Sequence, residues 1–163
     1  MKLLQLLRFW NPEDSWQAKK SNSKVYPKPK YATMTTTTKS GNTAHGKVNM
    51  AYRWYRFKKF TPYNLHFTVW IERKDVKPDD AEVIQAYFEK HLRAGCTAHC
   101  VGNLVTDYGL NLDFYVDDLD YTKEILGVLS KQEKDRVDFG VGFNRDPTWE
   151  AYKRLIGLTY SSN

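Results

Sequence analysis

The chain has few of the residues that build disulfide frameworks. Its 163 residues include only two cysteines, Cys96 and Cys100. Small secreted domains that depend on covalent cross-links carry about four or more cysteines. We therefore expect a fold that is held together by a hydrophobic core.

Long apolar runs are also missing. The N-terminal MKLLQLLRFW is interrupted by Arg8, and no A-x-A-like cleavage site follows it, which argues against a secretory signal. No stretch reaches the ~18 apolar residues that a membrane-spanning helix needs. These absences predict a soluble, cytoplasmic protein. The apolar residues within 1–20 predict a short amphipathic helix, which could touch a membrane, although packing on the parent domain is the favoured interpretation.

Motifs of catalysis and metal binding are absent from the sequence. There is no phosphate-binding glycine loop, no Gly-x-Ser-x-Gly and no His-Glu-x-x-His. His91, Cys96, His99 and Cys100 lie within ten residues. On a strand, however, the two cysteines would stand about 13 Å apart, too far to share a metal ion or a disulfide. We predict no enzymatic activity, no cofactor and no metal site.

Acidic residues are scarce at the N-terminal end. Residues 1–60 hold 13 Lys/Arg and 2 Asp/Glu, a net charge of +11, whereas residues 61–163 hold 12 and 17, a net charge of −5. Such a basic segment can bind nucleic acid or a membrane, or it can dock on the acidic half of its own chain. Self-docking or simple solvation is the favoured interpretation, because charge segregation alone specifies no partner.

What the chain does contain indicates one folded domain. Its hydrophobic content is 41% and its aromatic content 15%, as in globular proteins of this size. The polar stretch from Ser21 to Gly46, with Pro27, Pro29 and a threonine run, predicts a loop that contains at most one edge strand. We therefore predict a basic, partly ordered extension at residues 1–46 and a single α+β domain at 47–163.

Hydrophobic periodicity gives the first elements of that domain. KVNMAYRWYRF predicts a strand, and the turn TPYN leads to LHFTVWIE, in which apolar residues alternate. We expect these strands to form a hairpin over residues 48–72. A helix then follows, with Asp79 and Glu82 as a capping box and Gly95 as a left-handed stop.

The later elements follow the same logic. CTAHCVGNLVT and GLNLDFYVD, joined by DYG, predict a second hairpin. Asp117 or Asp118 is expected to cap a second helix, and RVDFGVGFN predicts a last strand. Residues 64–144 thus have the order β-α-β-β-α-β with both helices on one sheet face. This order predicts an α+β, ferredoxin-like split β-α-β fold with an added N-terminal strand or hairpin and a C-terminal helix.

Basic and aromatic residues interleave in the segment from Tyr52 to Phe60. Such side chains can stack on bases and neutralise phosphates. The alternative interpretation is an amphipathic strand with solvated cations, and it is favoured because no RNP motif or zinc knuckle accompanies the segment. The candidate nucleic-acid-binding residues are Arg53, Trp54, Tyr55, Arg56, Lys58 and Lys59.

A second candidate surface is the sheet face that points away from the two predicted helices. An aromatic face bordered by acids would suit a protein partner, although the terminal helix or the N-terminal segment can cover it instead. Cover is the favoured interpretation. The candidate protein-binding residues are His66, Trp70, Asp113, Tyr115 and Asp138.

The stretch NRDPTWEAYKRLIG resembles a catalytic loop in composition, yet its spacing is typical of a helix start. Asp146 fits an N-cap and Pro147 the first helical position. Trp149 and Tyr152 recur at helical spacing, so they predict a stripe that docks the terminal helix on the domain.

Two segments, VGNLVTDYGLNLDFYVDD and VDFGVGFNRDPTWEAYKR, resemble the bacterial family known as domain of unknown function 695. EDSWQ and GKVNMAY match the opening of that family more loosely, and the threonine-rich insert has no counterpart in it. The resemblance implies a ferredoxin-like α+β domain related in fold to RNase E regulator B-like domains, and it brings no established catalytic residues. The matching residues are Val101, Gly102, Thr106, Gly109, Phe114, Tyr115, Asp146, Pro147, Trp149 and Tyr152.

Two functions are therefore expected from the sequence. The first is a non-enzymatic protein-binding or regulatory module, for example an inhibitor or immunity protein for a basic partner such as a nuclease toxin. The alternative is RNA or DNA binding through the basic aromatic segment, residues 52–60. Another protein is the expected partner, and the oligomeric state stays open.

Overall fold

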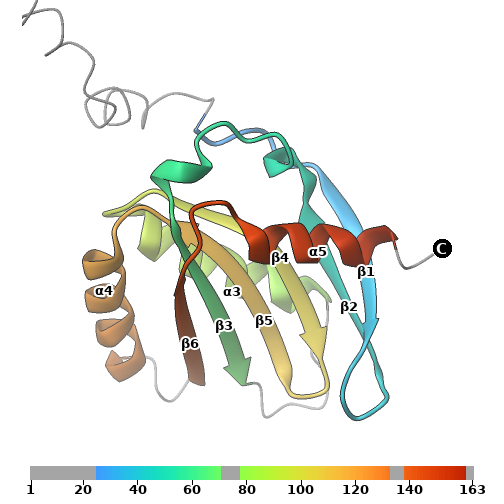
Figure 1. The fold of residues 1–163 in the computed structure, drawn as a ribbon. Helices are drawn as coiled ribbons and strands as arrows, with labels where there is room; N and C mark the ends of the chain where they lie inside the picture. The colour runs from blue at the N-terminus through green and yellow to red at the C-terminus, as the bar shows by residue number, and fades with distance from the viewer. Residues whose placement is uncertain (1–24, 71–77, 133–137, 161–163) are drawn as a thin grey trace, which may run out of the picture.

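The fold is known from a computed structural model that describes residues 25–70, 78–132 and 138–160. These residues form an α+β fold with one six-stranded antiparallel sheet and three α-helices (Figure 1). The helix predicted at residues 1–20 lies outside the described residues. The elements are β1 (Tyr31–Thr37), β2 (Thr43–Asn49), the 3-10 helices η1 (Met50–Tyr52) and η2 (Lys58–Phe60), β3 (Tyr63–Trp70), α3 (Pro78–Arg93), β4 (Ala98–Thr106), β5 (Gly109–Val116), α4 (Leu119–Gln132), β6 (Asp138–Arg145) and α5 (Glu150–Tyr160).

The strand order across the sheet is β1-β2-β4-β5-β3-β6, and every neighbouring pair is antiparallel. The β4–β5 hairpin predicted from the sequence is confirmed. The hairpin predicted over residues 48–72 is wrong, because β3 pairs with β5 and β6 while β2 pairs with β1 and β4. Strand β2 ends at Asn49, whose side chain accepts a hydrogen bond from the Ala51 N–H (3.2 Å) and so begins the turn of η1.

The threonine-rich stretch forms more structure than its composition predicts. Strand β1 lies at the sheet edge, and β2 joins it to β4 (Figure 1). Met34 and Ala44 are buried, so alternate side chains of this hairpin belong to the core. The boundary predicted between residues 46 and 47 therefore falls inside β2.

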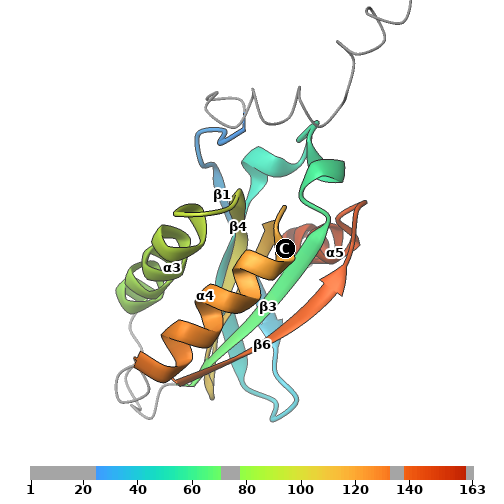
Figure 2. The ribbon, with the colours of Figure 1, turned by 90° about the vertical axis from the view of Figure 1, so that its left-hand side faces the viewer.

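Two hydrophobic cores flank the sheet. Helices α3 and α4 cover one face, as predicted, and Figure 2 shows them together on the same side. Phe88 and Leu92 of α3 and Leu126 of α4 pack there against alternate residues of β3, β4 and β5. This first core also takes up Phe139, Val141 and Phe143 of β6, which the sequence predicts to face inward.

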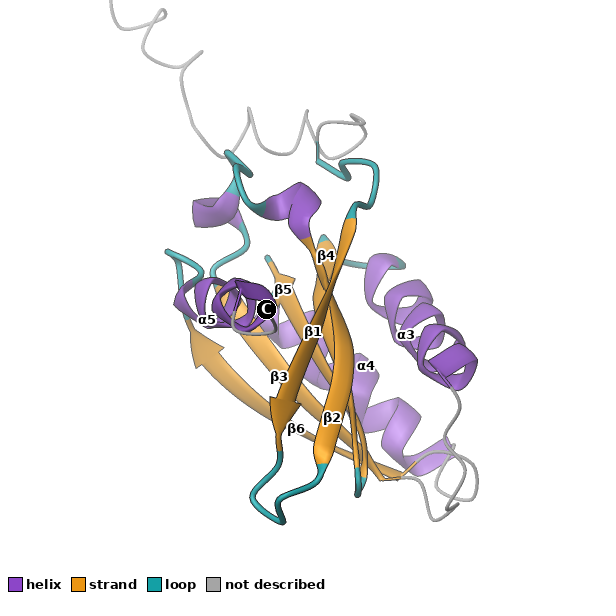
Figure 3. Ribbon diagram, turned by 90° about the vertical axis from the view of Figure 1, so that its right-hand side faces the viewer, coloured by secondary structure: helices purple, strands orange, loops and turns teal. Residues whose placement is uncertain are grey.

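Helix α5 lies on the opposite face, across β1, β2 and β4 (Figure 3). It helps to build a second core from aromatic side chains, with Trp149, Tyr152 and Tyr115 fully buried. The terminal helix thus covers part of this face, as the sequence analysis favoured. Tyr115 is consequently unavailable to a protein partner, and its assignment to a binding surface was wrong.

The ends of the first two long helices differ from the predictions in part. Helix α3 begins at Pro78 and already contains Asp79, and the Glu82 carboxylate pairs with Lys47 (2.6 Å), so the expected capping box does not describe this helix start. Gly95 is not in the left-handed region. A Cβ at this position would lie 2.3 Å from the Tyr121 ring, so Gly95 makes room for that ring. Asp118 caps α4 by accepting a hydrogen bond from the Tyr121 N–H (2.9 Å), as predicted.

The start of α5 lies later than the sequence predicts. The helix begins at Glu150, so Pro147 is not its first residue. The Asp146 carboxylate nevertheless accepts hydrogen bonds from the backbone N–H groups of Glu150 (2.8 Å) and Ala151 (2.9 Å) and caps the helix from a distance. Asp146 is connected to the helix by a turn at Pro147 and by Trp149, whose backbone is left-handed with a φ of 59°.

Candidate functional site

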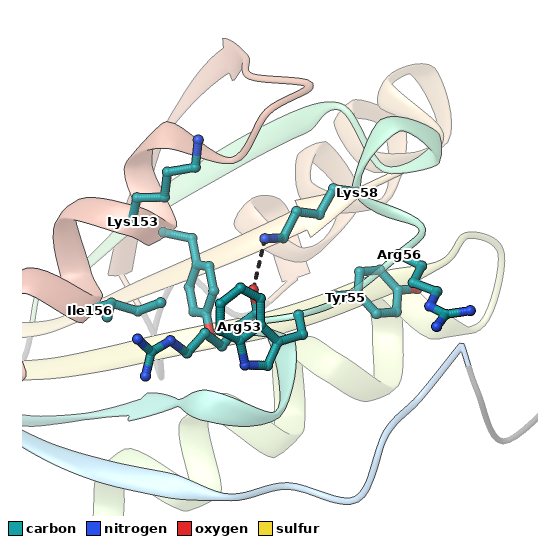
Figure 4. Close-up of a pocket in the computed structure, with 8 residues that line it drawn as sticks. Arg53, Tyr55, Arg56, Lys58, Lys153 and Ile156 are labelled. Carbon is teal, nitrogen blue, oxygen red and sulfur yellow. Dashed lines mark hydrogen bonds between the residues drawn. The ribbon is translucent and has the colours of Figure 1, made fainter.

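The basic aromatic segment and helix α5 border an open pocket of about 520 Å³. A volume of this size suits a small ligand or one unit of a polymer. The pocket lies between the loop that follows η1 and one flank of α5 (Figure 4). Its lining residues are Arg53, Trp54, Tyr55, Arg56, Lys58, Tyr152, Lys153 and Ile156.

Two buried tyrosines give the pocket a rigid base. The Tyr152 hydroxyl donates to the backbone carbonyl of Asn49 (2.7 Å), and the Tyr55 hydroxyl donates to the carbonyl of Val25 (3.1 Å). Both side chains belong to the second core, where burial raises the pKa of each phenol. They therefore stay neutral and fixed, with their rings held beneath the charged rim.

A buried histidine fixes the same segment from below. His99 of β4 is fully buried, and its Nε2 and Nδ1 lie 3.0 and 3.1 Å from the hydroxyls of Tyr55 and Tyr52. The Tyr55 proton goes to Val25, so Nε2 carries the imidazole proton and Tyr52 donates to Nδ1. Burial, and then the Arg93 charge, lower the pKa of His99 to about 3, which keeps the ring neutral. Its role is structural: it anchors both ends of the segment that carries Arg53 and Trp54.

Arg53 is ordered by aromatic contacts. Its Nη1 donates to the Tyr160 hydroxyl (2.9 Å), and its guanidinium lies 5.2 Å from the centre of the Trp54 ring and 5.9 Å from that of Tyr160. Trp54 itself is 82% exposed. Cation–π contacts of this kind reduce the freedom of the arginine while leaving its charge accessible to a ligand.

Lys58 sits deeper than the other cations. Its ammonium donates to the Arg53 carbonyl (3.2 Å; Figure 4). It also lies within 6 Å of the ring centres of Trp149 and Tyr152. Burial, together with the nearby Lys153 charge, lowers the pKa of Lys58. Both causes disfavour its positive charge, and a bound anion would offset them.

The charge of the pocket is one-sided. Four of its eight lining residues are cationic and none carries a carboxylate. Lys153 forms an exposed ion pair with Glu150 (2.6 Å), whereas within the described parts of the chain no ion pair engages Arg53, Arg56 or Lys58. Exposed pairs such as Lys153–Glu150 contribute little and exchange readily, so the site has an excess of positive charge.

The structure brings together most of the residues that the sequence singles out for nucleic-acid binding. Arg53, Trp54, Tyr55, Arg56 and Lys58 line the pocket, although Tyr55 contributes a buried ring. Lys59 does not line it, since its ammonium lies over the Phe60 ring at 4.9 Å. The segment forms turns rather than the amphipathic strand of the alternative interpretation.

Helix α5 adds residues that the sequence analysis did not connect with this site. They are Tyr152, Lys153 and Ile156. The spacing of Trp149, Tyr152 and Ile156 predicts a docking stripe, but nothing in the sequence indicates which segment lies beside it.

The second candidate surface is only partly available. His66 and Asp138 are exposed, Trp70 is 46% exposed, and Tyr115 is buried. Asp113 pairs with His66 (3.0 Å), and the hydrogen bond that this carboxylate accepts from the ring raises the pKa of His66. The space left by Gly140 is filled by the Trp70 ring, since a Cβ there would lie 2.8 Å from its Cη2. This face is therefore partly covered, and two of its charged side chains, His66 and Asp113, pair with each other.

The cysteine and histidine cluster is dispersed by the fold. Cys96 and Cys100 are buried thiols in the first core and are not joined in a disulfide, whereas His99 packs against Tyr52 and Tyr55 of the second core. Across residues 25–70, 78–132 and 138–160, no group of three potential ligands could hold a metal ion. Two further hollows, between β2 and α3, contain the paired side chains Lys47 and Glu82 and lack the one-sided charge.

Comparisons with known proteins assign neither a family nor a function to this chain. Family models, curated proteins and solved structures give no match to this chain. In the part of the chain that the structure describes, no helix has the length and apolar character needed to cross a membrane.

Proposed function

We propose that this protein is a non-enzymatic binding module that binds nucleic acid through the pocket between residues 53–58 and α5. The observation that carries the proposal is the pairing of four cationic side chains with an exposed indole, Trp54, in a pocket that no carboxylate lines. Cations neutralise phosphates, and aromatic rings stack on bases, so the two together are typical of nucleic-acid sites.

Binding rather than catalysis is supported by the state of the groups around the pocket. His99, the histidine beneath the pocket, has both ring nitrogens engaged by tyrosine hydroxyls and is fully buried. The phenols of Tyr55 and Tyr152 are committed to backbone carbonyls. These groups position the site, and they present no free proton donor or acceptor to a substrate.

Removing two rim cations tests the proposal. Arg53→Ala/Arg56→Ala should weaken binding of a labelled oligonucleotide by about tenfold or more, because two phosphate contacts are lost. The slope of log K against log salt should fall by about 1.4, since each phosphate contact on a single strand contributes about 0.7. Fluorescence polarisation across a salt series measures both quantities.

A control variant that loses the same charge elsewhere distinguishes binding at this pocket from general attraction to the positive charge of the protein. Lys90→Ala/Lys123→Ala removes two exposed cations from α3 and α4, on the opposite face of the sheet. This variant should bind like the wild type. Equal losses in the two double variants, or no binding by the wild type, would contradict the proposal.

A protein partner for the uncovered part of the sheet is a second proposal. It is supported by Trp70, which is 46% exposed, and by the neighbouring exposed Asp138. This surface is smaller than the sequence indicates, because Tyr115 is buried. A partner retained by the wild type and lost with Trp70→Ala in a pull-down would support an inhibitor or regulator role; retention by both would count against it.

The finer fold and family assignments are also proposals. A ferredoxin-like arrangement is supported by the order β4-β5-β3-β6, with α3 and α4 on one face and the β1–β2 hairpin added at the β4 edge. Kinship with the family called domain of unknown function 695 rests on the two sequence segments alone.

A further inference from the structure

We infer that the ligand of this pocket is a single-stranded nucleic acid, with an unpaired base stacked on Trp54 and its backbone phosphates bound by the surrounding cations. The inference rests on the proposed function and specifies its ligand. It follows from the exposure of one ring and from the way the cations are distributed around it.

The Trp54 ring is exposed to solvent, so a planar base can stack on it. It is 82% exposed, and it belongs to a short loop between η1 and η2 whose neighbouring residues are fixed by the buried tyrosines Tyr52 and Tyr55. An indole that is 82% exposed buries little area in this fold, so packing does not explain it. A base that stacks on such a ring gains about 1–3 kcal/mol, and any of the four bases can do so.

The cations do not converge on one point. Figure 4 shows Lys153 and Lys58 on one side of the pocket and Arg56 on the far side of Tyr55, with its guanidinium pointing away from them. A site for one free phosphate would gather its donors around one centre. Cations that follow one another across a pocket suit an extended chain of phosphates instead.

An unpaired strand suits this geometry better than a duplex does. Bases in a duplex are already stacked on each other, so an indole at the rim of a pocket has no free base face to contact. The half-buried Ile156, on the α5 side of the pocket, offers a further apolar contact to a base and none to a duplex backbone. An acidic peptide would satisfy the cations but would leave Trp54 without a stacking partner.

Substitution of Trp54 tests the inference, with Trp70 as a matched control. Trp54→Ala should weaken binding of a single-stranded 12-nucleotide RNA or DNA by roughly 5- to 150-fold, the equivalent of one stacked base. Trp54→Phe should retain much of the affinity, and the salt slope should stay unchanged in both variants because no phosphate contact is removed. Trp70→Ala, on the sheet face, should bind like the wild type. Since Trp54 is exposed, its loss leaves the fold intact, which far-UV circular dichroism checks.

Ligand variants distinguish this inference from the broader proposal. A blunt duplex of the same sequence should bind at least tenfold more weakly, an oligonucleotide of abasic sugars should lose the Trp54 dependence, and binding of the intact strand should quench tryptophan emission in the wild type more than in Trp54→Phe. Equal binding of duplex and single strand, or no effect of Trp54→Ala, overturns the inference while nucleic-acid binding stands. If poly-glutamate binds as tightly as the oligonucleotide and competes equally well for the protein, the inference is also overturned. Absence of any nucleic-acid binding overturns both.

Discussion

Trp149 combines full burial with a backbone conformation that bulky residues rarely adopt. Its φ is 59°, in the left-handed region, which costs about 1–3 kcal/mol for such a residue. Its ring stacks on Tyr115 with 4.1 Å between centres, and its Nε1 donates to the Thr61 carbonyl (3.1 Å). These contacts offset the strain, and they place the ring at the centre of the second core, beneath the pocket.

The hydrogen bonds of His99 allow the two tyrosines beside it to be ranked. Tyr55→Phe leaves both the Nε2–H of His99 and the Val25 carbonyl without their partner, whereas Tyr52→Phe leaves only Nδ1. Each buried polar group that loses its partner costs about 1–3 kcal/mol. We therefore expect Tyr55→Phe to lower the free energy of unfolding more than Tyr52→Phe does.

Urea denaturation followed by circular dichroism measures this difference. Tyr63→Phe is a suitable control, because its ring is only partly buried and packs at the margin of the first core. If Tyr52→Phe were the more damaging of the two, the proton arrangement assigned to His99 would be wrong.

At the scale of elements, one carboxylate joins three parts of the fold. Asp146 follows β6, accepts two backbone hydrogen bonds from the first turn of α5, and accepts a third from the Tyr115 hydroxyl of β5 (2.6 Å). Burial raises the pKa of Asp146, but these three donors lower it further, so the net result lies below the usual value. The position of α5, and with it one wall of the pocket, depends on this ionised group.

A pH-dependent loss of stability follows from that depressed pKa. A carboxylate of this kind contributes stability above its unfolded pKa of about 3.9, and the contribution is lost as pH falls through the folded pKa. Asp146→Asn should lower the free energy of unfolding by about 1–3 kcal/mol at pH 7, because one amide oxygen replaces two charged acceptors. The difference from the wild type should shrink as pH falls below about 4, since only the wild type titrates there.

Urea denaturation at several pH values between 3 and 7 tests this expectation. Asp138→Asn, an exposed carboxylate at the start of β6, should cause little change at any of these values. A difference that grows toward low pH would show that the charge of Asp146 does not stabilise the fold.

How much of this could be predicted from the sequence varies from element to element. Strands β5 and β6 were predictable because Leu110, Leu112 and Phe114 alternate with polar residues, as a strand with one face in a core requires. Strands β1 and β2 were not, because threonine and glycine conceal the buried positions Met34 and Ala44. Five of the eight pocket-lining residues were predictable from the interleaved cations and rings. The three that α5 contributes were not, since only tertiary packing places α5 beside that loop.

For the molecule as a whole, the sheet separates two hydrophobic cores, one packed on each of its faces. Neighbouring residues of β5 serve opposite sides, with Phe114 in the first core and Tyr115 in the second. The β1–β2 hairpin extends the second core through Met34 and Val48, which pack with the tyrosines beneath the pocket. The proposed binding site is therefore supported by the hairpin as well as by α5, and weakening the hairpin should weaken the site.

Gly46 is the position at which this dependence can be tested. A Cβ there would lie 2.0 Å from the Asn103 carbonyl oxygen and 2.9 Å from the Leu104 Cα, both backbone atoms of β4. Relief would require β2 and β4 to separate, so Gly46→Ala should lower the free energy of unfolding by about 1–3 kcal/mol or more. Gly127→Ala, in α4, meets nothing within 4 Å and should instead stabilise by about 0.5–1 kcal/mol, because alanine favours helix. Urea denaturation followed by far-UV circular dichroism and by tryptophan fluorescence measures both variants. If the hairpin unfolds together with the rest of the domain, Gly46→Ala shifts the circular-dichroism and fluorescence transitions together and also weakens oligonucleotide binding. If this variant keeps wild-type stability and binding, neither the fold nor the site depends on the hairpin.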